Sequence, residues 1–129
     1  MKFHYTNLET CHEATGVVVV IDVLRAFSNA AYAFSRGAWE IYPVGGVQEA
    51  LKFKAETPNS LAAGEVGGLP PEGFDFGNSP TQTKELDLSG RVIVQSTGAG
   101  TKGIVRSVNA ETMLAASLVV ANATVQFIR

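Results

Sequence analysis

Three polar positions come directly after β-forming runs of the sequence, and their residue types suit metal and phosphate chemistry. They are Asp22, Glu65 and the pair Ser96-Thr97. If the preceding runs are parallel strands, their carboxyl ends lie on one edge of a sheet, where ligands of open α/β sheets bind. Carboxylate oxygens are the ligands that Mg²⁺ prefers in proteins. We therefore predict that Asp22 and Glu65 are metal ligands and catalytic residues of one site.

A purely structural interpretation of the two carboxylates stays open. Asp22 precedes a helix expected to start near Leu24, so its side chain could simply cap that helix. Glu65 could be a solvated loop residue. The sequence alone does not separate these alternatives from a metal site.

Arg25 lies at the predicted start of the same helix, where the helix dipole disfavours a positive charge. A phosphate or sulfonate oxygen bound at this helix terminus would compensate the charge through a bidentate guanidinium contact. An ion pair with Asp22 or another acid is the alternative. We predict Arg25 as a substrate-binding residue.

A glycine-rich segment, Gly98-Ala99-Gly100-Thr101-Lys102-Gly103, follows the predicted strand that ends at Gln95. It matches the dinucleotide fingerprint formally, but no acidic residue ends a strand about 20 residues later, and the Walker phosphate loop is absent. Glycines that expose backbone N–H groups, with threonine hydroxyls nearby, can still form an anion cradle. We predict that Thr97, Gly98, Gly100 and Thr101 bind an anionic substrate group, with a plain tight turn as the alternative.

The elements that must position these residues alternate between strand and helix patterns. Val17 to Ile21 is a continuous β-branched run, typical of a strand buried on both faces. The predicted strands are Val17 to Ile21, Trp39 to Val44, Ser60 to Gly64, Arg91 to Gln95 and Glu111 to Ser117, and the predicted helices are Leu24 to Arg36, one beginning at Val47 and Val119 to Arg129. This alternation predicts one α/β domain over residues 1–129, a layered α/β/α fold with a largely parallel or mixed central sheet. We expect the first, second and fourth of these strands to share that sheet.

Composition narrows the classes of partner. The chain has 129 residues, of which 46% are hydrophobic, and a formal net charge of −2 without a cluster of Lys and Arg. A nucleic-acid surface would need a basic stripe, so we expect no nucleic-acid partner. The longest aliphatic run is far shorter than the roughly 20 residues of a membrane span. With one cysteine and no signal-like N-terminus, a cytoplasmic location is expected.

Four segments together resemble the 2-phosphosulfolactate phosphatase family in order and spacing. They are Val19 to Ala26, Ala63 to Gly68, Gly73 to Pro80 and Ser96 to Thr101. The resemblance implies a Mg²⁺-dependent phosphatase that hydrolyses a small anionic phosphate monoester, converting 2-phosphosulfolactate and water into 3-sulfolactate and phosphate, a step of coenzyme M biosynthesis.

The resemblance also implies a metal and substrate site made of Asp22, Arg25, Glu65, Asn78, Ser79, Thr97, Gly98, Gly100 and Thr101. Family members are considerably longer, so the chain resembles the N-terminal part of such a phosphatase. The alternative to an enzyme is a non-catalytic module that keeps the anion cradle. Core surface left uncovered in a shorter chain would favour a homo-oligomer.

Overall fold

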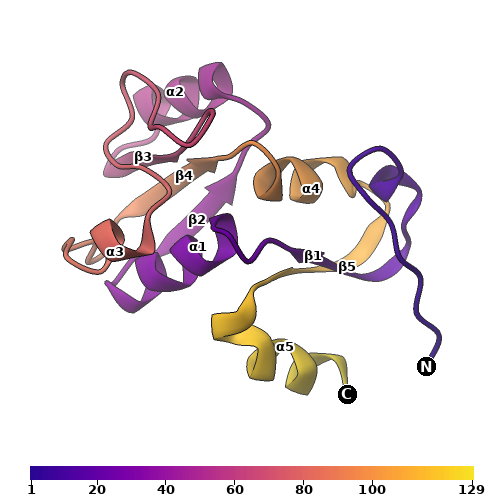
Figure 1. Cartoon of the computed structure of the whole chain (residues 1–129). Helices are drawn as coiled ribbons and strands as arrows, with labels where there is room; N and C mark the ends of the chain where they lie inside the picture. The colour runs from indigo at the N-terminus through magenta and orange to yellow at the C-terminus, as the bar shows by residue number, and fades with distance from the viewer.

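The computed structural model describes all residues from 1 to 129, as twelve short elements separated by loops (Figure 1). In chain order these are η1 (Cys11–Glu13), β1 (Gly16–Ile21), α1 (Ala26–Ser35), β2 (Glu40–Pro43), α2 (Val47–Glu56), β3 (Ser60–Gly64), α3 (Pro80–Thr83), β4 (Val92–Ser96), α4 (Gly100–Arg106), β5 (Ala110–Ala116), η2 (Leu118–Val120) and α5 (Ala121–Ile128). The five predicted strands are all present, and the predicted α/β class is confirmed.

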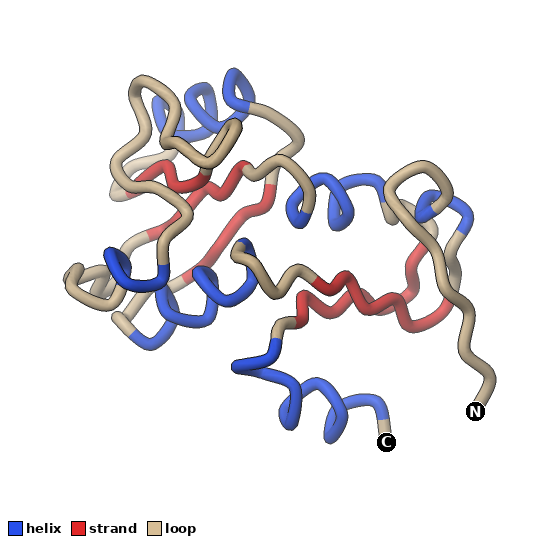
Figure 2. The backbone as a smooth tube through the Cα atoms, in the orientation of Figure 1, coloured by secondary structure: helices blue, strands red, loops and turns tan.

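The strands form two separate parallel sheets (Figure 2). One sheet has three strands in the order β2-β4-β3, with Tyr42 and Ala62 both in register with Val94 of the central strand. The other has two strands, β1 and β5, with Val18 opposite Met113 and Ile21 opposite Ala116. We call the β2-β4-β3 sheet with α1, α2 and α3 the body, and β1, β5, η2 and α5 the arm.

The prediction that the first, second and fourth strands share one sheet is wrong. β2 and β4 are neighbours, but β1 pairs only with β5. Both edges of β4 are already occupied, by β2 and β3, so β1 cannot pair with it. The expected burial of β1 on both faces is also wrong, since only Val18 is buried whereas Val17 and Ile21 are 53% and 70% exposed.

The core of the body lies on both faces of the three-stranded sheet. On one face Ile93 packs with Ala33 of α1 and Leu88, and on the other Val94 packs with Ala50 of α2. The alternation of side chains along β4 sends Ile93 and Val94 to opposite faces. Both are at most 1% exposed, so the central strand is enclosed by its two helices.

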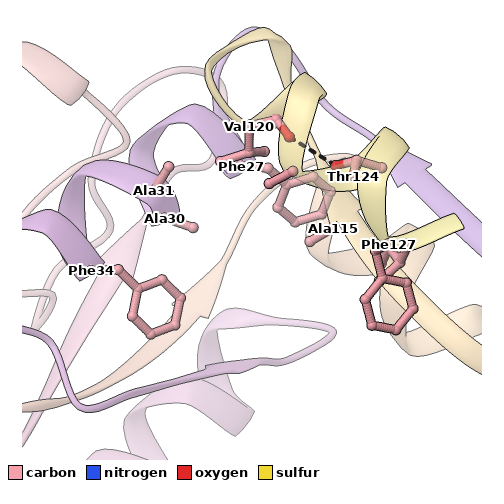
Figure 3. Close-up of a pocket in the computed structure, with 10 residues that line it drawn as sticks. Phe27, Ala30, Ala31, Phe34, Ala115, Val120, Thr124 and Phe127 are labelled. Carbon is pink, nitrogen blue, oxygen red and sulfur yellow. Dashed lines mark hydrogen bonds between the residues drawn. The ribbon is translucent and has the colours of Figure 1, made fainter. Parts of the chain in front are cut away.

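The arm carries an apolar groove in place of an enclosed core. The groove, of about 290 Å³, lies between α1, β5 and α5, and nine of its ten lining residues are hydrophobic. Phe27, Phe34 and Phe127 line it, and Thr124 turns its hydroxyl away to the Val120 carbonyl at 3.0 Å (Figure 3). Helix α5 contains no buried residue. None of the helices has the length and apolar character needed to cross a membrane.

Candidate active site

The loop between β4 and α4 brings the predicted site residues together, although they come from two sheets. Gly100 opens α4 against the start of α1, and a Cβ atom built on it would lie 2.6 Å from Asp22 Oδ2 and 2.8 Å from Ala26 Cβ. Its backbone needs no positive φ, so glycine is required here by close approach alone. The Asp22 carboxylate therefore contacts the loop directly.

Asp22 sits where β1 ends, and its carboxylate has one bonded and one free oxygen. Its backbone N–H donates to the Ala116 carbonyl at 3.0 Å, which fixes it beside the end of β5. Asp22 Oδ1 accepts a hydrogen bond from the Ala26 N–H at 3.2 Å. The capping interpretation is thus correct for Oδ1, while Oδ2 has no hydrogen-bond partner and faces Gly100.

Glu65 contacts the same loop from the β3 side and joins two loops. Its Oε1 accepts the Gly98 N–H at 2.7 Å, and its Oε2 accepts the Gly68 N–H at 2.8 Å. These two bonds, aided by the positive charges of Arg25 and Lys102, lower the pKa of the Glu65 carboxyl below its ordinary value. The ionised Glu65 carboxylate therefore links the 65–68 turn to the 97–101 loop, so Glu65 is not a solvated loop residue.

Arg25 is half-buried at the N-cap position of α1, and its guanidinium has no carboxylate partner. The close pairs of basic and acidic side chains are His12 with Glu13, Lys54 with Asp75 and Lys84 with Glu85. The alternative of an ion pair with Asp22 or another acid is therefore not observed. The charge of Arg25 nevertheless acts on Glu65, which places it in the electrostatic environment of the site.

The predicted anion cradle uses much of its hydrogen-bonding capacity internally. The Thr97 N–H donates to Thr101 Oγ1 at 2.8 Å, and the Thr101 N–H donates to Thr97 Oγ1 at 3.2 Å. The Gly98 N–H is bound by Glu65. Both threonines are buried, so they serve first to fix the shape of the loop. Within this loop, the N–H groups of Ala99 and Gly100 are the ones without a hydrogen-bond partner; Ala99 is exposed and Gly100 is buried.

Asn78 and Ser79 lie beside the end of β3 without a hydrogen bond to the 97–101 loop. Phe76 runs next to β3, since the Gly64 N–H donates to its carbonyl at 3.2 Å. Asn78 is 6% exposed, and its Oδ1 is buried without a partner, an acceptor that could serve a ligand or water. Ser79 is the N-cap residue of α3, with Pro80 as the first helical residue, as predicted from the sequence.

The donor set near the loop fits a magnesium ion at Asp22 better than at Glu65. Mg²⁺ commonly takes one or two carboxylates and completes its shell with water and substrate phosphate oxygens. Asp22 Oδ2 is free for this purpose, whereas both carboxylate oxygens of Glu65 accept hydrogen bonds from backbone N–H groups. No cluster of three or more His, Cys, Asp or Glu side chains is present that could hold a metal by itself.

Two further features of this region were not singled out from the sequence. A cleft of about 130 Å³ opens on the α2 side of the loop, and Gly46, Ser96, Lys102 and Glu65 are among its lining residues. Ser117 follows β5 as Asp22 follows β1, and its buried Oγ has no hydrogen-bond partner. The rule of polar residues at strand ends could have found Ser117, but no local pattern marked Lys102.

Comparison with known proteins gives a match to one protein family. The sequence model of the 2-phosphosulpholactate phosphatase family matches residues 3–129. A "Probable 2-phosphosulfolactate phosphatase" of Carboxydothermus hydrogenoformans is 41% identical over 111 residues, which cover 86% of this chain and 46% of that protein.

Two further relatives carry the same name. The one from Thermus thermophilus is 41% identical over 114 residues, covering 88% of this chain and 47% of the relative. The one from Caldicellulosiruptor saccharolyticus is 35% identical over 125 residues, covering 97% of this chain and 52% of the relative. The chain spans about half the length of the curated relatives that it matches.

Proposed function

This chain belongs to the 2-phosphosulpholactate phosphatase family, and we propose that it supplies the Mg²⁺-dependent site that hydrolyses 2-phosphosulfolactate to 3-sulfolactate and phosphate. The observation that carries the proposal is the convergence of Asp22 and Glu65 on the 97–101 loop, with Arg25 close enough for its charge to act on Glu65. A carboxylate with a free oxygen, an unpaired guanidinium and backbone N–H groups without a partner together suit a phosphate ester. A cytoplasmic location is part of the proposal.

Each residue has a distinct proposed task in that reaction. Asp22 Oδ2 would hold the magnesium ion, and Arg25 would bind and orient the phosphoryl oxygens. Glu65 keeps the 97–101 loop in place through Gly98. Bound Mg²⁺ would offset charge on the phosphoryl oxygens and lower the pKa of a coordinated water.

The first prediction tests Asp22 by replacing it with asparagine. Asp22→Asn keeps the size of the side chain and an acceptor oxygen for the Ala26 N–H, but removes the charge. We expect Mg²⁺-dependent phosphate release from 2-phosphosulfolactate to fall at least ~100-fold, since metal stabilisation is worth several kcal/mol. The urea midpoint should stay within experimental error of the parent chain.

Asp87→Asn is the matched control, because Asp87 is an exposed aspartate before the opposite, amino-terminal end of β4. It should leave the rate unchanged. Near-normal Mg²⁺-dependent turnover in Asp22→Asn would refute the role given to Asp22.

The second candidate function is a non-catalytic anion-binding module. It is favoured by one fact, that the chain spans about half the length of its curated relatives. Such a module would bind phosphate or the substrate without releasing phosphate. Calorimetric binding beside a phosphate-release assay, each with and without Mg²⁺, separates the two functions.

A further inference from the structure

Ser117 is a buried serine whose hydroxyl the fold itself does not use. It follows Ala116, the last residue of β5, and is 3% exposed. Its Oγ is buried without a hydrogen-bond partner, whereas the buried hydroxyl of Ser107, ahead of the other end of β5, donates to the Gly103 carbonyl at 2.8 Å. An unpartnered buried hydroxyl costs free energy, so its presence in a native fold requires an explanation.

Ser117 lies opposite Asp22 in the parallel ladder of β1 and β5. Ile21 is in register with Ala116, and the Asp22 N–H donates to the Ala116 carbonyl at 3.0 Å, which continues the ladder by one position. The backbone of Ser117 is still extended, with φ −148° and ψ 177°. Neighbouring strands are about 5 Å apart, so Ser117 is a direct neighbour of the candidate metal ligand.

The two side chains lie on the face of the arm that α4 covers. A Cβ atom built on Gly103 would lie 2.7 Å from Val20 Cγ1, and one built on Gly100 would lie 2.6 Å from Asp22 Oδ2. Val20 and Asp22 therefore share this face, as the alternation of side chains along a strand requires. Ser117 belongs to the same face, because paired residues of neighbouring parallel strands point to the same side of a sheet.

The carboxylate of Asp22 favours a water over a phosphoryl oxygen as the partner of Ser117. A serine oxygen can accept two hydrogen bonds and donate one. The negative charge of Asp22 repels an anionic phosphoryl oxygen and attracts a cation. Mg²⁺ bound by one or two carboxylates usually keeps several waters, which donate hydrogen bonds to nearby oxygens. Ser117 Oγ is a buried acceptor available to such a water.

We propose that Ser117 is a further residue of the metal site, and that its hydroxyl hydrogen-bonds a water of the cation held by Asp22. This inference rests on the proposed function for the presence of the cation at Asp22. Ser117 is then a positioning residue, since it acts through a water and does not touch the substrate. Its hydroxyl has no partner within the fold because its partner arrives with the cation.

The test measures Mg²⁺ binding to the full chain by calorimetry, without substrate. Ser117→Ala removes only the hydroxyl. We expect the Mg²⁺ affinity to fall at least about tenfold, because the loss of an outer hydrogen-bond partner of a metal site costs roughly 10- to 100-fold. The affinity for inorganic phosphate, measured without Mg²⁺, should stay the same. An unchanged Mg²⁺ affinity would overturn the proposal, and so would a fall in phosphate affinity, which would place Ser117 at the substrate.

Ser107→Ala is the matched control, because Ser107 is 1% exposed and its hydroxyl is bonded to the Gly103 carbonyl of α4. It should keep the Mg²⁺ affinity of the parent chain and have a lower urea midpoint, since it loses a hydrogen bond. Ser117→Ala should show the opposite pattern, with weaker Mg²⁺ binding and a metal-free urea midpoint no lower than that of the parent. A midpoint that falls as far as in Ser107→Ala would show that the fold uses the Ser117 hydroxyl, and would overturn the proposal.

Phosphate release from 2-phosphosulfolactate keeps this inference separate from the proposed function. Mg²⁺ binding that depends on Ser117, in a chain that releases no phosphate, would support the metal site and refute the enzyme. Mg²⁺-dependent release with the same Mg²⁺ requirement in Ser117→Ala would support the enzyme and overturn the role of Ser117. A parent chain that binds no Mg²⁺ at a concentration of about 10 mM would refute both.

Discussion

The body and the arm differ in how completely they bury their apolar side chains. In the body, Ile93 and Val94 of the central strand are at most 1% exposed, with helices against both faces. In the arm, Ile21 of β1 is 70% exposed and Leu118 of η2 is 74% exposed. Both regions consist of parallel strands with short helices, so secondary structure does not explain the difference. The difference comes from the number of sheet faces that helices cover: both faces of the sheet are covered in the body, and the sheet of the arm is less covered.

This difference shows which part of the molecule supports the site. The 65–68 turn and the 97–101 loop both follow strands of the enclosed sheet, and Glu65 connects them. Asp22 alone comes from the arm, and the Gly100 contact holds it against the loop. Stability changes in the body should therefore reach the site more readily than changes on the exposed face of the arm.

The largest expected effect comes from comparing one leucine in each region. Leu88→Ala removes a side chain that is 1% exposed in the core of the body and should lower the free energy of unfolding by about 2–5 kcal/mol. Leu118→Ala acts on an exposed side chain of the arm and should cost less than ~0.5 kcal/mol. Urea unfolding of both variants measures the contrast, and equal losses would mean that the arm is buried in solution.

A second prediction concerns the apolar groove. An exposed apolar patch of this kind favours association, so we expect the chain to self-associate and to bind a hydrophobic dye. Phe127→Asp places a charge on a side chain that is 65% exposed and should weaken self-association at least tenfold, the loss of roughly one buried aromatic contact. Light scattering across a concentration series measures it.

Tyr5→Asp is the control for that experiment, because Tyr5 is 98% exposed and lies near the N-terminus outside the groove. It should associate as the parent chain does. A parent chain that stays monomeric at high concentration without dye binding would show that the groove closes in solution.

The smallest expected effect is a change in acid stability at the rim of the body. The Ser89 hydroxyl and N–H both donate to Asp87 Oδ1, at 2.6 and 3.1 Å, and lower the pKa of the Asp87 carboxyl below its ordinary value of 3.8. A lowered folded-state pKa adds stability above the unfolded pKa, and that stability is lost as the pH falls through the folded value.

Asp87→Asn should therefore be slightly less stable than the parent chain at neutral pH, and the gap should close below about pH 3.8. Thermal unfolding midpoints from pH 2 to pH 7 measure this effect. A gap that is constant over the whole pH range would show that the Ser89 hydrogen bonds do not depend on the charge of Asp87.

The sequence by itself determined the local elements and the chemistry of the site residues. Runs of β-forming residues predicted all five strands, helical spacing predicted helices, and Pro80 marked the start of α3. These signals depend only on neighbouring residues and on backbone sterics. The positions of Asp22 and Glu65 at strand ends were also evident from the sequence, since a strand end is a local feature. The four resemblant segments pointed to the family that the matched residues 3–129 confirm.

Only the tertiary structure decided which strands pair and what each polar atom contacts. The run from Val17 to Ile21 indicates a strand that could be buried on both faces, but it carries no information on whether a second layer is present. Likewise, the hydrogen bond from the Gly98 N–H to Glu65 joins residues 33 positions apart, and the surroundings of Lys102 come from segments far apart in the sequence. Pairing and burial are non-local because they are set by the competition of all elements for the same edges and faces.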